Sequence, residues 1–290
     1  MTNWTLEFRP EEDASVARVI IAGNWIGDVK DVRSLLIDIC RQWPPGCKVR
    51  YLITCGGFLQ FSWPFAPVMG RTGRPALTSP NTLISVAQKC CDSLLHDNLV
   101  RRLTECTRYL TLGVDSEEES SNQRKPHVEL VGLFDLEQQN WHWTGKSYPR
   151  GDQVAGLVQI TDLRTHFVDL EGERVMILGC HDLNMFSNRA KATTKKEWRS
   201  KISRDILTLA KKNEPTRVIQ HPHTTDSVRN WATAMSGLWK SVPTVREFAS
   251  AGKWYRKNKW GLPEEPRSPL QKVLETTKLG QTIDIIVRWR

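Results

Sequence analysis

Three segments near the start of the chain constrain the fold most, because they have the patterns of a strand, a helix and a strand. Val16–Ala22 and Val49–Thr54 are short, β-branched, apolar runs, which are typical of strands. Between them, Asp28 can cap a helix that runs to about Trp43 and stops at Pro44-Pro45-Gly46. The apolar residues of this helix share one face: Val32, Leu35, Leu36, Ile39 and Cys40. This order indicates an α/β sheet.

The rest of the sequence continues the alternation of strands and helices. Extended segments are predicted at Arg108–Val114, His127–Phe134, Trp141–Lys146, Thr216–Gln220 and Thr282–Val287. A hairpin is predicted where His166–Leu170 and Arg174–Leu178 flank Glu171-Gly172-Glu173. Helices are predicted after Ser79-Pro80, from about Lys195 to Lys212, and after Ser227. The acidic stretch from Asp115 to Pro126 is predicted to be a solvated loop.

Length and composition are typical of one globular domain. The chain has 290 residues, 39% hydrophobic and 25% charged, and we expect a single α/β domain over 1–290 with a basic, Trp/Pro-rich C-terminal extension from about residue 250. No run approaches the roughly 18 apolar residues of a membrane span, and no signal peptide is recognisable. Seven cysteines, an odd number without a CxxC pair, indicate free thiols and a cytoplasmic location.

Polar side chains cluster where predicted strands end, which is where ligands bind in open α/β sheets. Cys180 directly follows a strand and precedes His181 and Asp182, while His221 and His223 follow another strand. Cys180 is either a nucleophile activated by nearby backbone N–H groups and cations, or a buried thiol beside a loop-capping Asp182. Because adjacent residues on a strand point to opposite faces, His181 is not automatically its base.

A metal site is a second interpretation of the same strand ends. Histidine and carboxylate side chains suit zinc, manganese or iron, and residues two apart on a strand share a face. The candidate ligands would be His181, Asp182, His221, His223 and Asp226. This set has no recognised metal-binding spacing, so we expect neither a metal nor another cofactor.

The segment from Val175 to Phe186, a hydrophobic strand followed by Cys180 and Asp182, resembles the nucleophile segment of the carbon–nitrogen hydrolase family, the nitrilase superfamily. The predicted strands that lead to Gly145-Lys146 resemble its lysine segment, and the resemblance covers most of residues 16–245. It implies an αββα sandwich and often a homodimer. It also implies hydrolysis of a small-molecule amide or nitrile, with Cys180 as the nucleophile and Lys146 stabilising the developing charge. The alternative for Lys146 is a surface lysine in a turn.

One departure from the family pattern concerns the catalytic base. The family carries a Glu at the end of its second strand, whereas this sequence has Gly56 there, between Cys55 and Gly57. Asp152, just past Lys146, and His181 or His223 are the candidate replacements. Without a base, the chain would instead be a nitrilase-like binding or regulatory protein that does not catalyse.

The charge pattern leaves room for an anionic partner. The formal net charge is +9, and residues 189–204 hold seven Lys or Arg in sixteen positions. These charges either form the solvated face of a helix or a positive rim that guides an anionic substrate. Nucleic acid is the less favoured partner, because no recognised binding motif accompanies the charge.

Overall fold

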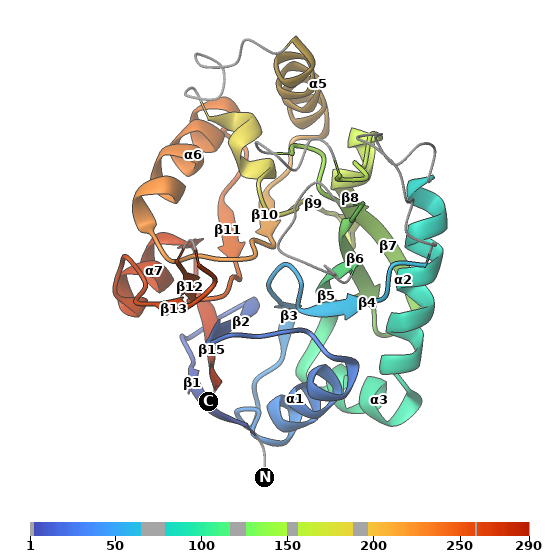
Figure 1. The fold of residues 1–290 in the computed structure, drawn as a ribbon, viewed down its shortest axis with the longest axis vertical. Helices are drawn as coiled ribbons and strands as arrows, with labels where there is room; N and C mark the ends of the chain where they lie inside the picture. Colours follow the sequence, from blue (N-terminus) through green and yellow to red (C-terminus); the bar gives the residue numbers. More distant parts are fainter. Residues whose placement is uncertain are drawn as a thin grey trace.

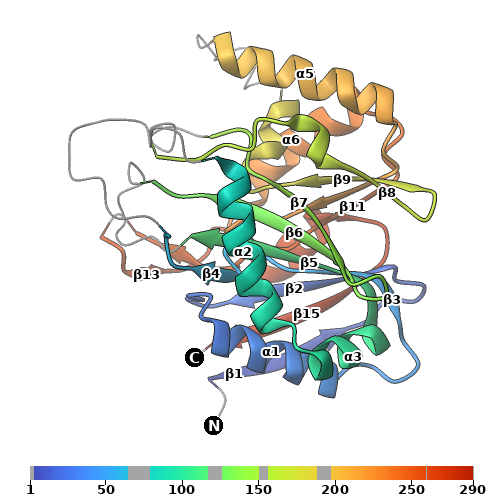
Figure 2. The same ribbon diagram turned by 90° about the vertical axis from the view of Figure 1, so that its right-hand side faces the viewer.

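Two β-sheets packed face to face form the centre of the protein, and helices cover their outer faces (Figures 1 and 2). A computed structural model describes residues 3–64, 79–116, 126–149, 156–187, 197–258 and 260–289. The described part therefore has the four layers helix, sheet, sheet and helix. This is the αββα sandwich expected from the resemblance.

The first sheet has eight strands and the second has five. The order of the first is β1 (Trp4–Arg9), β15 (Thr282–Trp289), β2 (Val16–Ala22), β3 (Val49–Ile53), β5 (Thr107–Ser116), β6 (Glu129–Asp135) and β7 (Asn140–Gly145), with β4 (Leu59–Phe61) also paired to β5. The order of the second is β14 (Lys278–Leu279), β11 (Glu247–Ser250), β10 (Arg217–Gln220), β9 (Glu173–Leu178) and β8 (Phe167–Leu170). A separate pair joins β12 (Arg256–Lys257) to β13 (Pro263–Glu264).

The central strands of both sheets are parallel, so their carboxyl ends share one edge. The pairs β15–β2, β2–β3 and β3–β5 are parallel in the first sheet, as are β9–β10 and β10–β11 in the second. The hairpin partners β6 and β7 run antiparallel, and β7 returns to the edge where β5 ends.

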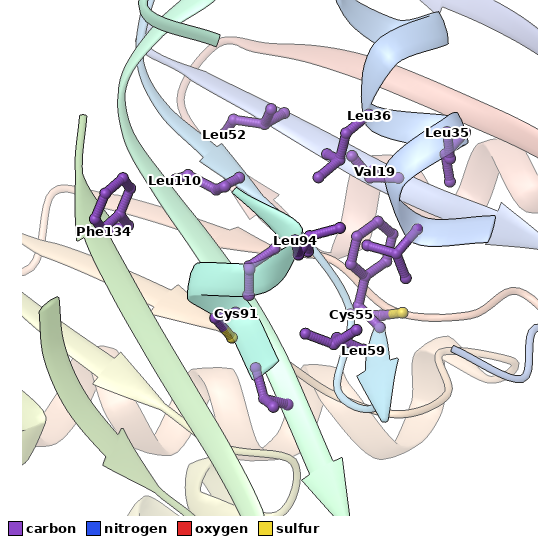
Figure 3. Packing of buried hydrophobic residues seen from close by; sticks show 14 of the residues in the cluster. Val19, Leu35, Leu36, Leu52, Cys55, Leu59, Cys91, Leu94, Leu110 and Phe134 are labelled. Carbon is purple, nitrogen blue, oxygen red and sulfur yellow. The ribbon is translucent and has the colours of Figure 1, made fainter. Parts of the chain in front are cut away.

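The helices cover the two outer faces. The first face carries α1 (Val29–Arg41), α2 (Pro80–Leu94) and α3 (Asp97–Cys106), whose apolar side chains join the outer face of the first sheet (Figure 3). The second carries α5 (Glu197–Asn213), α6 (Val228–Ser241) and the 3-10 turn η3 (Asp182–Phe186). The helix α7 (Leu270–Thr276) packs into the layer between the sheets, and a second 3-10 turn, η2 (Leu163–His166), precedes β8.

Alternation of side chains along the strands builds the layers. In β9, Val175 and Ile177 lie in the core between the sheets, whereas Met176 and Leu178 pack against the outer helices. Both faces of β9 are buried, which explains why the strand is apolar at every one of these positions.

The local patterns of the sequence are largely confirmed. Asp28 caps α1 by accepting from the Lys30 N–H, and Ser79 caps α2 by accepting from the Asn81 N–H. The predicted hairpin is β8–β9, with Glu171 at a φ of 52° in its turn. The predicted loop from Asp115 is wrong at its start, because β5 continues to Ser116. Residues 117–125 of that loop lie outside the described part. Within the described part, no helix is long and apolar enough to cross a membrane.

A buried ion pair anchors β15 to its neighbours. The fully buried Arg18 of β2 donates to both carboxylate oxygens of Asp284 in β15, at 2.8 Å each. The same guanidinium donates to three carbonyl oxygens: that of Ser250 at the end of β11, that of Leu274 within α7 and that of Thr277 just after α7. One side chain thus holds elements from both sheets together.

We predict that Asp284→Asn costs about 3–5 kcal/mol of unfolding free energy, because it leaves the Arg18 charge buried without a counterion. The double variant Arg18→Met with Asp284→Leu should recover most of this loss, since it buries no charge. Urea titrations at fixed pH measure both. The control is Glu7→Gln, because Glu7 also pairs with an arginine, Arg9, but is more exposed than Asp284. A loss from Asp284→Asn no larger than that of the control would contradict the prediction.

Candidate active site

The loop after β9 presents the thiol of Cys180. Gly179 connects the strand to this loop, and a Cβ on Gly179 would lie 2.9 Å from Asp182 Oδ2 and 3.1 Å from the backbone nitrogen of Lys146. Only glycine therefore allows the end of β9 to approach the end of β7 this closely. The thiol itself is buried, with Cys180 7% exposed.

Asp182 fixes the ends of these two strands relative to each other. Its Oδ1 accepts the N–H groups of Ser147 and Tyr148 at 3.0 and 2.8 Å, and its Oδ2 accepts the Gly179 N–H at 3.0 Å. Asp182 is fully buried, and burial raises the pKa of its carboxyl group. Asp182 therefore has the contacts of a loop-capping carboxylate, which was one of the alternatives that the sequence allowed.

Lys146 directly follows β7 and is not a surface lysine, because its side chain is fully buried. Its Nζ donates to both carboxylate oxygens of Glu129, at 2.7 and 2.8 Å. Burial lowers the pKa of Lys146, but the negative charges of Glu129 and Cys180 outweigh burial and raise it. Burial would likewise raise the pKa of Glu129, but His223 and Lys146 hold it at about 2. Both groups are therefore charged at neutral pH.

His223 contacts the thiol from the segment that follows β10. Its backbone N–H donates to Cys180 Sγ at 3.4 Å. Its Nε2 forms a close hydrogen bond with Asp115 Oδ2, and its Nδ1 lies 3.6 Å from Glu129 Oε2. Burial lowers the pKa of His223, but Asp115, Cys180 and Glu129 together raise it well above its usual value.

The thiol of Cys180 is in an environment that favours the thiolate. Burial alone would raise its pKa, but the charges and hydrogen bonds of His181 and His223 bring it well below the ordinary value of a thiol. One atom each of Glu129, Cys180 and His223 lie within 4.8 Å of one another. The cluster thus holds a thiol, a carboxylate and an imidazole, and the Lys146 ammonium group is bound to the carboxylate.

The five residues proposed as metal ligands do not converge. The carboxylate of Asp182 is taken by backbone N–H groups, and His221 Nδ1 donates to the Thr54 carbonyl at 2.7 Å. Burial lowers the pKa of His221 to about 4. Asp226 instead lies near Arg256 and Arg267. The interpretation as a metal site is therefore wrong for this set.

The described residues contain one other group with metal-binding atoms, formed by Glu129, Cys180 and His223. It fits a cation poorly, because the Lys146 ammonium already binds both oxygens of Glu129. A metal ion there would have to displace this buried positive charge.

Sequence reasoning missed Glu129 and Asp115, although the predicted strands His127–Phe134 and Trp141–Lys146 contained a signal for the first. The β6–β7 register pairs Leu130 with Gly145, so Glu129 lies opposite Lys146. Asp115 is paired with Glu129 across β5 and β6 and is 7% exposed. Asp152, the carboxylate suggested as a base, lies outside the described residues.

The basic segment is described only from residue 197, and residues 189–196 lie outside the described part. Arg199 donates to the Pro149 carbonyl at 3.2 Å, and its guanidinium lies over the rings of Tyr148 and Trp198. The start of α5 thus lies beside the segment that follows Lys146. Lys201 and Arg204 are exposed. A guiding role for these charges stays a prediction.

Comparisons with known proteins gave matches in structure only. No family model and no curated protein matches the sequence. A cysteine-to-alanine mutant of an amidase from Nesterenkonia AN1, of the nitrilase superfamily, is similar at 12% identity, over 84% of this chain and 78% of that chain, with a TM-score of 0.48. The amidase of Nesterenkonia sp. AN1 after removal of its His-tag is similar at 10% identity, over 89% and 95%, with a TM-score of 0.45.

We predict that Asp182→Asn lowers the unfolding free energy by about 1–3 kcal/mol. An amide offers one accepting oxygen, so its NH₂ group must face at least one of the three N–H donors and leave it unsatisfied. Urea unfolding measures the loss. Asp162→Asn is the matched control, because Asp162 also caps a backbone N–H group but is exposed. Equal losses in the two variants would contradict the role of Asp182.

We also predict that Cys180 is alkylated by iodoacetamide faster than the other six cysteines at about pH 7. Its lowered pKa keeps more of it as a thiolate as the pH falls, so its rate should fall less between about pH 8 and about pH 6 than that of an ordinary thiol, which slows about tenfold per unit. Peptide mapping by mass spectrometry assigns each rate. A rate for Cys180 that falls in parallel with that of Cys90 would contradict an activated thiolate.

Proposed function

We propose that this chain is a divergent member of the nitrilase superfamily that hydrolyses a C–N bond of a small amide or nitrile through Cys180. The observation that carries the proposal is that the Cys180 sulfur lies close to Glu129, which forms a buried ion pair with Lys146. A buried ion pair is expensive to maintain for stability alone, because each charge loses its water. A fixed cation beside an activated thiol instead fits covalent catalysis, in which charge develops on the substrate.

The residues divide the reaction into two steps. The Cys180 thiolate attacks the carbonyl carbon of an amide, a C–S bond forms, and the negative charge that develops on the oxygen is stabilised by the Lys146 ammonium group. The C–N bond then breaks, the leaving nitrogen takes up a proton, and a thioester remains. Water attacks the thioester, the C–S bond breaks, and the carboxylic acid and the Cys180 thiolate are formed. The proton that the water releases replaces the one taken up by the leaving nitrogen. A nitrile would give the corresponding thioimidate.

Glu129 holds the cation of this proposed site in place. Its carboxylate accepts hydrogen bonds from the Lys146 ammonium through both oxygens. With this geometry, Glu129 keeps Lys146 charged and oriented while the substrate oxygen gains its charge. No redox or cofactor-dependent step enters this scheme.

The alternative is a nitrilase-like binding or regulatory protein without catalysis. Gly56 at the position of the expected Glu is the observation that favours it. The two functions differ in one measurable respect, because a binding protein would hold an amide or nitrile without releasing ammonia.

Turnover of a panel of primary amides and nitriles, followed by ammonia release, tests the proposal. We expect at least one compound to be hydrolysed, and Cys180→Ala to reduce kcat by at least about 10³-fold at an unchanged melting temperature. Cys90→Ala is the matched control, since Cys90 lies on α2 and is only partly buried. Its activity should equal that of the wild type.

Two results would count against hydrolysis at Cys180. If turnover survives Cys180→Ala, another group performs the chemistry. If the wild type releases no ammonia from any compound that it binds, the non-catalytic alternative holds.

A further inference from the structure

The space beside Gly56 and Gly57 is filled by two polar side chains. A Cβ on Gly56 would lie 2.8 Å from the His221 carbonyl oxygen and 3.2 Å from both the backbone nitrogen and the Nδ1 of His223. A Cβ on Gly57, whose φ is 60°, would lie 3.0 Å from Asp115 Oδ2. The two glycines therefore let the turn after β3 pack directly against His223 and Asp115. A longer side chain at position 56 would need the room that the imidazole occupies.

Asp115 sets the orientation of the His223 ring. The close hydrogen bond with Asp115 Oδ2 uses Nε2, so this nitrogen carries a proton that it donates to the carboxylate. Nδ1 remains on the other side of the ring, facing Glu129 at 3.6 Å within the cluster that contains the Cys180 sulfur. The backbone N–H of His223 also contacts that sulfur. The ring is therefore held with one nitrogen available to exchange a proton.

Glu129 is poorly suited to the role of a base, because Lys146 binds both of its oxygens. A carboxyl group with a pKa of about 2 holds a proton weakly at neutral pH. The charged and titratable groups that face His223 are Asp115 from β5, Glu129 from β6 and Cys180 after β9, and Cys55 lies nearby. The negative groups dominate, so the imidazole readily holds a proton taken from the thiol.

We propose that His223, oriented by Asp115, is the general acid–base group of Cys180 and occupies the space that Gly56 leaves open. This inference rests on the proposed function. His223 holds the proton of Cys180 before the reaction, so that Sγ attacks the substrate carbon as a thiolate, and it gives that proton to the leaving nitrogen as the C–N bond breaks. It then takes a proton from the attacking water and keeps it when the C–S bond breaks, so that the thiolate and the protonated imidazole are restored. Asp115 is a positioning residue that acts through His223.

The test combines variants of the pair with two readouts, the pH dependence of Cys180 alkylation and the turnover of an amide. His223→Gln keeps an N–H donor for Asp115 but has no titratable nitrogen. It should raise the alkylation midpoint by more than about one pH unit and reduce kcat by about 10²–10⁴-fold. Asp115→Asn should shift the midpoint in the same direction by less. Gly56→Ala, which crowds the ring, should also raise it.

The matched control is His142→Gln. Like His223, His142 is partly buried, but its Nε2 donates to the Thr165 carbonyl and not to a carboxylate. This variant should change neither readout. The inference is overturned if folded His223→Gln and Asp115→Asn both keep the wild-type midpoint. If the midpoint shifts as expected but the wild type hydrolyses no amide or nitrile, the pairing of His223 with Cys180 stands and the proposed function fails.

Discussion

The carboxylate of Asp182 is the contact on which the candidate site depends, because it ties a strand end of one sheet to a strand end of the other. It accepts N–H groups from Ser147 and Tyr148, which follow β7, and from Gly179, which follows β9. Burying a carboxylate is costly, but three backbone donors offset that cost. This contact therefore fixes the backbone next to Lys146 relative to the backbone next to Cys180.

The charges brought together at this edge compensate one another in pairs. Lys146 binds Glu129, and His223 binds Asp115, while the thiol of Cys180 faces both positive groups. Exclusion of water strengthens each of these interactions, so one change in charge alters the others. This coupling explains how a buried thiol can have a lowered pKa although burial alone would raise it. A sandwich of two sheets makes the arrangement possible, since strand ends from both sheets meet around one volume.

Local sequence patterns predicted much of the fold, because capping, turn chemistry and side-chain periodicity act over a few residues. They located α1 with its Asp28 cap, the β8–β9 hairpin and the final strand β15. They did not predict that β15 lies between β1 and β2, parallel to β2, nor that β5 continues through Asp115. Strand neighbours depend on contacts between distant segments. An acidic residue at a strand end cannot be distinguished by its type from one in a solvated loop.

The sequence by itself determined which groups are available at strand ends: Cys180 after β9, Lys146 after β7 and two histidines after β10. Only the tertiary structure decided that His223 turns toward the thiol while His221 bonds a carbonyl. It also recruited Asp115, which is 108 positions from its partner His223. The reason is physical: the direction of a side chain follows from its own backbone, but its pKa and its partners follow from whatever distant charges the packing of the sheets brings within a few ångströms.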